Sequence, residues 1–436
     1  MGFAEKLFRL SENKTSVRQE VMAGVTTFVT MAYVIFVVPA MVSETGMPKD
    51  ALFAATIWAA ALTTLFMGLW ANMPIGLAPG MGIIAYFTYS VVLGMSLPWQ
   101  TALGAVFISG VVFLFLSVTK IRSMIIASVP KNLTLAISVG IGLFIAFIGL
   151  RGAGIVISHP ANSVGLGDLE NTHVLLALFS LVFTGVLLAL RVRGAILIGI
   201  LVTTAIGMVI GAGPVPRSVS DVVNFNVPSV MPTFMQMDIM AAVKHGLISV
   251  LFTMTMVDLF DSIGTIIGVS RKAGLMNEDG SIKGLEKALV VDSCGTIWGS
   301  FLGTPAVTSY VESSAGVAEG GRTGLTAVTV GVLFLICLVF APIVGVVQSY
   351  ATAPALIIVG ALMAEDMTAI NFKDMTEGLP AFLTIICMPL TYSIANGFGI
   401  GFISYVLLKT CTGRFREVSP VMWIVSVCFA ISFVMR

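Results

Sequence analysis

The sequence predicts an all-α polytopic membrane protein with fourteen transmembrane segments, arranged as two inverted repeats of seven. Three observations lead to this fold class. Hydrophobic residue types make up 57% of the 436 residues and charged types only 10%, whereas a soluble domain carries about 25% charged residues. Apolar segments alternate with short polar stretches along nearly the whole chain. The basic residues gather on one predicted side of the membrane.

The elements follow one another in a simple order. A polar tail, residues 1–20, comes first, and no cleavable signal peptide is expected because the next apolar run is too long for one. Several of the fourteen segments are shorter than the roughly 20 residues that a full crossing needs. A last apolar stretch, 421–435, either lies at the membrane interface or completes a pair. The predicted segments are 21–42, 51–71, 75–93, 102–118, 133–150, 174–190, 196–213, 248–269, 288–302, 307–317, 325–341, 351–364, 380–394 and 397–411.

The distribution of charge tests this topology. With a cytoplasmic N-terminus and fourteen crossings, all but five of the 23 basic residues lie on the cytoplasmic side. The exceptions are Lys49, Arg151, Arg217 and Lys244 on the outer side, with Arg436 unassigned. Cytoplasmic loops of membrane proteins carry such an excess of Lys and Arg. We therefore expect a multi-pass protein of the plasma membrane with its N-terminus in the cytoplasm and the lipid bilayer as its surroundings.

The composition excludes several classes of protein. A net charge of +1 leaves no basic surface for nucleic acid. The five cysteines show no metal or disulfide spacing, and three histidines are too few for an imidazole metal centre. No zinc-protease, nucleophile-elbow or phosphate-loop motif is present, so neither an enzyme nor a cofactor is expected.

Two corresponding segments are interrupted. Pro74–Phe87 (PIGLAPGMGIIAYF) opens the third segment and Gly303–Val317 (GTPAVTSYVESSAGV) opens the tenth, and each begins with Pro and Gly. Because each half has an odd number of segments, the second half is inverted relative to the first. Broken helices leave N–H and carbonyl groups that lipid cannot satisfy but a substrate can. Paired interruptions in inverted halves indicate a transport site near the membrane midplane.

Four acidic residues lie within the apolar segments, where a carboxylate needs a partner or a wet cavity. Asp258 and Asp261 are three residues apart in the eighth segment, and so share roughly one helix face. Glu312 lies in the interrupted tenth segment. Neither segment contains a basic residue, so a proton, a cation or a substrate with N–H donors must satisfy these acids. Asp292, in a DSCGT that repeats the DSIGT at Asp261, is expected to cap the start of the ninth helix.

Long strings resemble one family almost from end to end. The chain resembles the AzgA-like purine permeases, a branch of the nucleobase–cation symporters that include uracil and xanthine permeases. The strings are AGVTTFVTMAYVIFV, NMPIGLAPGMG, GIGLFIAFIGL, LFDSIGTIIGV, TSYVESSAGVAEGGRTGLTAV and APALIIVGALM.

The resemblance implies a core domain and a gate domain, with short strands in segments three and ten. The core consists of segments 1–4 (residues 21–128) and 8–11 (247–342). The gate consists of segments 5–7 (129–213) and 12–14 with the C-terminal apolar stretch (343–436), and an extracytoplasmic loop, 214–246, separates the halves. Members of the wider group often dimerise through gate helices, so a homodimer is expected.

The resemblance also assigns roles to residues. Asp261 would bind the base and take part in proton coupling, and Glu312 would accept hydrogen bonds from ring N–H groups. Backbone at Val311 and in segment three would contribute further polar contacts, and Asp258 would serve coupling or structure. The family motif GMGLNAF or GMGLNAY carries an Asn where this chain has Ile84, which can offer the base only its backbone.

These features predict a proton-coupled importer of purine nucleobases, with hypoxanthine and guanine favoured and adenine next. Protonation of the Asp261 and Glu312 region from outside would allow the base to bind, and the core would then slide or rock against the gate. An anion carrier of the same architecture is an alternative, because half-helix N-termini attract anions, but Glu312 would repel them. An intramembrane aspartyl protease using Asp258 or Asp261 would need two acids to meet from different helices.

Overall fold

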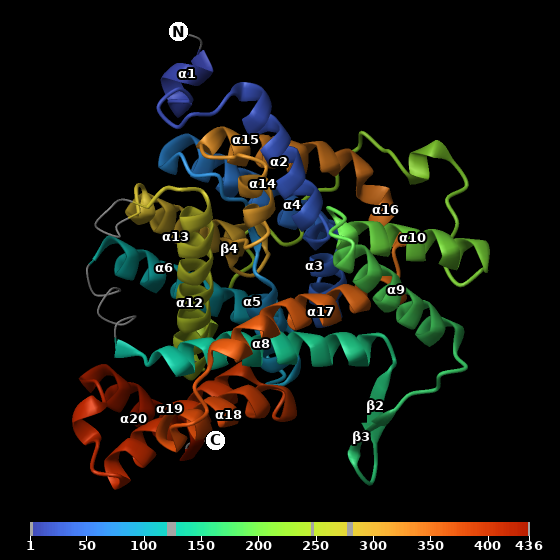
Figure 1. Cartoon of the computed structure of the whole chain (residues 1–436). Helices are drawn as coiled ribbons and strands as arrows, with labels where there is room; N and C mark the ends of the chain where they lie inside the picture. Colours follow the sequence, from blue (N-terminus) through green and yellow to red (C-terminus); the bar gives the residue numbers. More distant parts are fainter. Residues whose placement is uncertain (1–2, 120–127, 246–247, 277–281, 435–436) are drawn as a thin grey trace.

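The computed structural model of the chain describes residues 3–119, 128–245, 248–276 and 282–434, which are almost entirely helical (Figure 1). Eight helical stretches are long and apolar enough to cross a membrane, and five shorter apolar helices accompany them. The prediction of a multi-pass helical membrane protein is confirmed. Lys120, Arg122 and Arg436, which entered the charge count, and the predicted boundary at 246/247 lie outside the described residues.

The first half of the chain runs to the end of α10, and η marks short 3₁₀ or π turns. Its elements are α1 (Phe3–Phe8), α2 (Val17–Met31), α3 (Val34–Val42), η1 (Ser43–Thr45), α4 (Lys49–Phe66), η2 (Met67–Ala71), β1 (Leu77–Pro79), α5 (Met81–Ala85), η3 (Tyr86–Leu93), α6 (Trp99–Val118), α8 (Lys131–Gly152), β2 (Val156–His159), β3 (Ser163–Leu166), α9 (Thr172–Ala189) and α10 (Ala195–Val209).

The second half begins with a loop that carries two short helices. Its elements are η4 (Val219–Asp221), α11 (Ile239–Lys244), α12 (Ile248–Lys272), α13 (Leu285–Leu302), β4 (Val307–Ser309), α14 (Ser313–Ala318), α15 (Gly324–Ile336), η5 (Cys337–Phe340), α16 (Ala341–Val346), α17 (Ser349–Met363), η6 (Ala364–Ala369), α18 (Met375–Leu390), α19 (Ile394–Cys411), η7 (Phe415–Glu417) and α20 (Pro420–Val434).

A two-stranded antiparallel ladder joins the two halves. Strand β1 pairs with β4 in the register Leu77↔Ser309, Ala78↔Thr308 and Pro79↔Val307. All six residues are buried. The Thr64 hydroxyl on α4 bonds both the N–H and the carbonyl of Leu77, each at 2.9 Å. Backbone that is not helical needs such partners inside a membrane, so the two interruptions satisfy each other.

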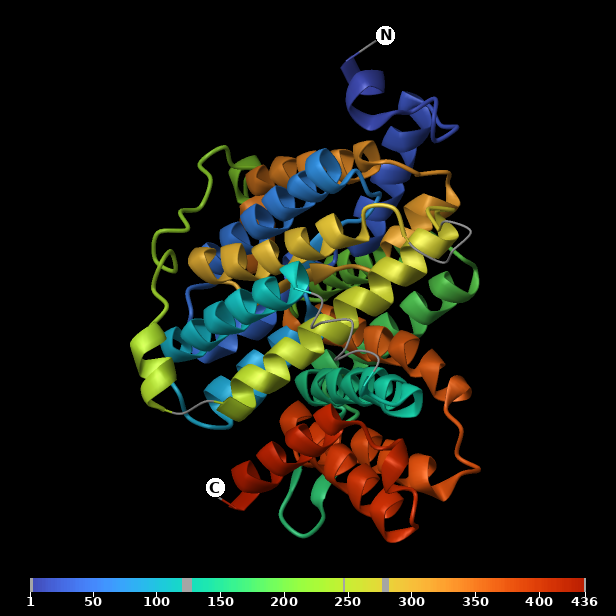
Figure 2. The same ribbon diagram turned by 90° about the vertical axis from the view of Figure 1, so that its left-hand side faces the viewer.

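The helices pack in two groups, visible in both views (Figures 1 and 2). In one group α15 packs on α2 and α4, and α13 packs on α4 and α6. In the other group α8 packs on α17 and α18, and α9 and α10 cover α17. Helix α12 runs beside the first group, contacting α6, α13, α14 and β4, and also contacts α19 of the second. Strands β1 and β4 lie within the first group, in contact with α4, α12 and α13, whereas β2 and β3 form a separate hairpin after α8 (Figure 1).

The first transmembrane segment is broken in its middle. Helix α2 ends at Met31 and α3 begins at Val34, so Tyr33 lies at the break. The break contains no proline. The Thr30 hydroxyl bonds the carbonyls of Thr26 and Thr27 at 3.1 and 2.8 Å. Such back-bonding competes with the helix ladder and bends helices, which accounts for the break at this place.

Glycines allow the helices of the first group to approach closely, and one pair gives a direct test. A Cβ added at Gly324 would overlap the carbonyl oxygen of Gly68. Gly324→Ala should therefore destabilise the fold by about 1–3 kcal/mol, the usual cost of overpacking. The measurement is the melting temperature of the detergent-solubilised protein. Gly185→Ala on α9 is the control, because its Cβ would have no atom within 4 Å. Equal melting temperatures for the two variants would contradict this account of the packing.

Candidate functional site

Strand β4 directs two successive hydroxyls to two different acids. Neighbouring residues of a strand point to opposite faces. Accordingly Thr308 hydrogen-bonds with Asp261 of α12, whereas the Ser309 hydroxyl donates to Asp292 of α13 at 2.8 Å. Two adjacent residues of the strand thus bond acids on two different helices. A helix would present the two hydroxyls only about 100° apart, so the strand is what separates the acids.

Asp261 and Glu312 form the partly exposed pair of acids. Both side chains are neither fully buried nor fully exposed. They come from neighbouring elements, since α12 packs on α14, and they are close enough for their charges to interact. No basic side chain of the described residues forms an ion pair with either. Two carboxylates without a cation repel each other if both are ionised, so the pair is suited to hold a proton or to accept N–H donors.

Glu312 precedes α14 and is held from two sides. The Tyr33 hydroxyl, at the break in the first segment, donates to Oε1 of Glu312 at 2.8 Å. The Tyr310 hydroxyl donates to the Pro79 carbonyl at 2.6 Å, and the Ser313 hydroxyl accepts from the Gly76 N–H at 3.0 Å. These bonds fix the segment around Glu312 to the strand β1 and to α3.

Asp258 and Asp292 form a second, deeply buried pair behind β4. The Thr296 hydroxyl of α13 donates to Oδ2 of Asp258 at 2.8 Å, and Oδ1 has no partner among the described residues. Asp292 accepts from the hydroxyls of Ser262 and Ser309. Asp258 is 1% exposed and Asp292 0%, so neither reaches the surface that Asp261 and Glu312 share. Asp258 and Asp261 share roughly one face of α12, but they have different neighbours. Asp258 bonds α13, whereas Asp261 lies beside Glu312, the residue before α14.

The expectation that Asp292 caps a helix is wrong. Helix α13 begins at Leu285, so Asp292 lies two turns inside it. The polar residues before it, Lys283 and Lys287 among them, suggested a later start, but the helix simply extends into the loop. The DSxGT motif, which occurs at both Asp261 and Asp292, could have indicated a role for Asp292 in the site. It places the same acid and hydroxyl residues on α12 and α13, which pack together.

Val311 and Ile84 lie on the two interrupted segments. Val311 is 61% exposed, directly before Glu312. Ile84 is fully buried in the core, and its N–H donates at 2.9 Å to the carbonyl of Gly80, the residue before α5. The first N–H groups of a helix have no partner inside it, so the backbone of α5 that remains available is at Met81–Ile83, before Ile84.

The residues that hold the acids were not among the predicted site residues. In the structure Tyr33 is 1% exposed and acts as a hydroxyl donor. Thr308 and Ser309 gave a weak indication of a site, because two adjacent hydroxyl residues are unusual within an apolar segment.

One aromatic residue links the two helix groups. Tyr392, on the turn between α18 and α19, has a left-handed backbone with φ of 53°. Its ring meets Phe144 and Tyr89 edge to face at centroid distances of 5.5 and 6.0 Å, and the Arg151 guanidinium lies 5.1 Å from its centre. Its carbonyl accepts from the Ser90 hydroxyl at 3.0 Å. Helices α8 and α18 belong to one group, whereas η3, which carries Tyr89 and Ser90, packs on α6 of the other group. Tyr392 therefore spans the boundary.

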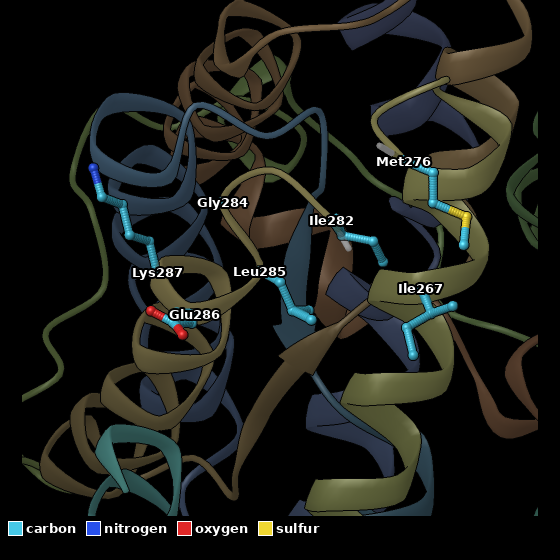
Figure 3. Close-up of a pocket in the computed structure, with 7 residues that line it drawn as sticks. All are labelled: Ile267, Met276, Ile282, Gly284, Leu285, Glu286 and Lys287. Atoms are coloured by element: carbon cyan, nitrogen blue, oxygen red, sulfur yellow. The ribbon is translucent and has the colours of Figure 1, made fainter. Parts of the chain in front are cut away.

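A pocket separate from the four acids lies near the C-terminal end of α12 (Figure 3). It measures about 590 Å³ and is lined mainly by apolar side chains, with Ile267, Ile282 and Leu285 facing the space between α12 and α13. None of the four acids lines it. We therefore assign it no part in the site. Within the described residues, no group of three His, Cys, Asp or Glu side chains could hold a metal ion.

The sequence is similar to known permeases over its whole length. A permease of Methanocaldococcus jannaschii is 49% identical, covering 100% of this chain and 99% of the relative. The adenine permease AdeP of Escherichia coli is 43% identical, covering 99% and 96%. The guanine/hypoxanthine permease PbuO of Bacillus subtilis is also 43% identical, covering 98% and 99%. The relatives are transporters, which confirms the prediction of a transport protein rather than an enzyme.

The fold is similar to that of a solved transporter. The transmembrane domain of the cyanobacterial bicarbonate transporter BicA superposes with a TM-score of 0.63, covering 91% of this chain and 98% of that domain at 15% identity. At this identity the likeness concerns the fold alone. The sequence model described as the permease family, which takes in xanthine and uracil permeases, matches residues 18–400. Together with the relatives, this match confirms the predicted resemblance: the chain belongs to the permease family.

Proposed function

We propose that this chain is a secondary active transporter that imports purine nucleobases across the plasma membrane by proton symport. The pair Asp261 and Glu312 carries the proposal, because it places two carboxylates, which have no cationic partner among the described residues, where two interrupted segments meet. The names of the relatives, an adenine permease and a guanine/hypoxanthine permease, support the substrate class. Hypoxanthine and guanine rank first and adenine next.

The chemistry of a purine matches the site. A purine presents ring N–H groups on its edge, and a carboxylate is the strongest acceptor for them. Glu312 and Asp261 supply these acceptors. The backbone at Val311, a residue that is 61% exposed, and the first turn of α5 supply the remaining polar contacts. Ile84 contributes through the fold of α5, because its side chain is buried.

Proton coupling follows from the same two acids. An ionised pair would repel, and a purine that donates to both, or a proton on one of them, removes the repulsion. We assign the transported proton to Asp261, which is bonded to Thr308 and lies next to Glu312. Asp258 lies three residues earlier on α12, and one of its oxygens has no partner within the part of the chain that the structure describes, so it is the second candidate to carry that proton.

The two helix groups supply the moving parts. We propose fourteen segments in two inverted halves, with the first group as the core domain (21–128 and 247–342) and the second as the gate domain (129–213 and 343–436). The core carries all four acids and moves against the gate. Tyr392 spans the boundary and would have to release Ser90 and Tyr89 when the outer side opens. The N-terminus is cytoplasmic, and two copies pair through gate helices.

Uptake by cells that lack purine permeases of their own tests the proposal. Radiolabelled hypoxanthine, guanine and adenine should each show saturable uptake, and each unlabelled purine should compete. Sulfate and bicarbonate serve as anion competitors and should have no effect. Accumulation should fall when a protonophore collapses the pH gradient and should persist when sodium is replaced. Accumulation that survives loss of the gradient would contradict proton symport, and competition by sulfate without competition by purines would favour anion transport.

A further inference from the structure

We infer that Tyr33 is a positioning residue of the purine site, whose hydroxyl holds Glu312 in the orientation that binds substrate. The inference rests on the proposed function, since it concerns the same site. Tyr33 lies in the first transmembrane segment, 279 residues from Glu312 in sequence, and donates to Oε1 at 2.8 Å. A bond to an ionised acceptor is about twice as strong as one between neutral groups.

The bond leaves one oxygen of Glu312 for the substrate. Oε1 accepts from Tyr33, and no other side chain of the described residues donates to the carboxylate, which also accepts from the N–H of Glu312 itself. Because the carboxyl is partly exposed, a ring N–H can reach Oε2. Tyr33 itself is 1% exposed, so its ring is not available for stacking on a base. Its contribution to the site is therefore the hydroxyl.

Without Tyr33, the carboxylate of Glu312 would lose its side-chain partner. It makes no cap bond to α14, because the N–H groups of Ser313, Ser314 and Ala315 already donate to the carbonyls of Tyr310, Val311 and Glu312 at 3.1, 2.9 and 2.9 Å. Removing the Tyr33 hydroxyl would therefore leave the Glu312 side chain free to change rotamer and to leave the orientation that binds the substrate.

Helix packing fixes the distance between the two residues. Gly316 of α14 lies against Ala23 and Thr27 of α2, so closely that a Cβ there would overlap the Ala23 carbonyl. Tyr33 lies two residues after the end of α2, in the break of the first segment, and its side chain is buried. Both partners of the bond thus belong to elements in tight contact, and neither depends on a mobile loop.

Tyr33→Phe removes the hydroxyl and keeps the ring. We expect the KM for hypoxanthine to rise about tenfold to a hundredfold, as for loss of one bond to a charged group, while the maximal rate changes less than about threefold. Tyr350→Phe is the matched control, because the Tyr350 hydroxyl is also buried but has no partner among the described residues. Its KM should equal that of the parent chain.

Each outcome is decisive. A raised KM with a retained maximal rate and normal membrane abundance supports the positioning role. An unchanged KM overturns it. Loss of the folded protein, measured by its elution in detergent, also overturns it, because the hydroxyl would then serve folding. The parent chain is measured alongside: if it takes up no purine, the proposed function fails, whereas a changed ratio of variant to parent concerns Tyr33 alone.

Discussion

Glu312→Gln should abolish high-affinity purine uptake. The amide keeps the size of the side chain but replaces one acceptor oxygen by an NH₂ donor, which faces either the Tyr33 hydroxyl or a ring N–H of the purine. Each hydrogen bond to a charged group is worth about 1.5–3 kcal/mol. Loss of both the charge and one acceptor should therefore raise the KM by roughly 100-fold or more.

The measurement is initial uptake of labelled hypoxanthine across a wide concentration range. Glu170→Gln is the control, because Glu170 is an exposed acid in a loop and its side chain makes no bond among the described residues. Glu170→Gln also removes one negative charge, but at a position outside the site. Uptake by Glu312→Gln equal to that of the parent, at both limiting and saturating substrate, would refute a binding role for Glu312.

Asp261→Asn should separate transport from accumulation. The amide cannot lose or gain a proton near neutral pH, so the chain would no longer use the pH gradient to concentrate its substrate. In proteoliposomes with an imposed gradient, accumulation above equilibrium should fall at least tenfold, which corresponds to about 1.4 kcal/mol of lost driving energy. Exchange of internal unlabelled purine for external label needs no net proton movement, and should persist at a reduced rate.

Asp366→Asn is the control for this experiment, since Asp366 is exposed in the turn η6. It should accumulate purine as the parent does. Full accumulation by Asp261→Asn would assign the proton to another group. The next residue to change would be Asp258, one oxygen of which has no partner among the described residues. Loss of both accumulation and exchange would make Asp261 a binding residue without a separable coupling role.

The class of the protein could be predicted from the sequence because lipid imposes strong constraints on composition. Long apolar runs, a one-sided distribution of Lys and Arg, and acids inside apolar segments each have few explanations. Asp261 and Glu312 were found in this way. Their surroundings could not be found, because a hydroxyl donor is common in the sequence and its acceptor lies far away along the chain. Tyr33 and Thr308 acquire meaning only once α3 and β4 lie beside the acids.

The misplaced cap at Asp292 has a similar cause. Local rules for helix ends are reliable when the polar residues of a loop mark the boundary, but α13 continues through them for two turns. The division of Asp258 and Asp261 between different neighbours also follows from packing. Three residues along a helix differ by about 60° in direction, and only the positions of α13 and α14 decide which acid is buried.

The ladder of β1 and β4 has a consequence for how the protein is made. When Leu77–Pro79 enter the membrane during synthesis, Val307–Ser309 have not yet been translated, and the backbone of β1 lacks its partner strand. In lipid such backbone groups are costly, so the first half must remain shielded by the insertion machinery or by neighbouring helices until the second half arrives. The N-terminal half expressed alone should therefore be a target for quality-control proteolysis, and co-expression with the C-terminal half should rescue it.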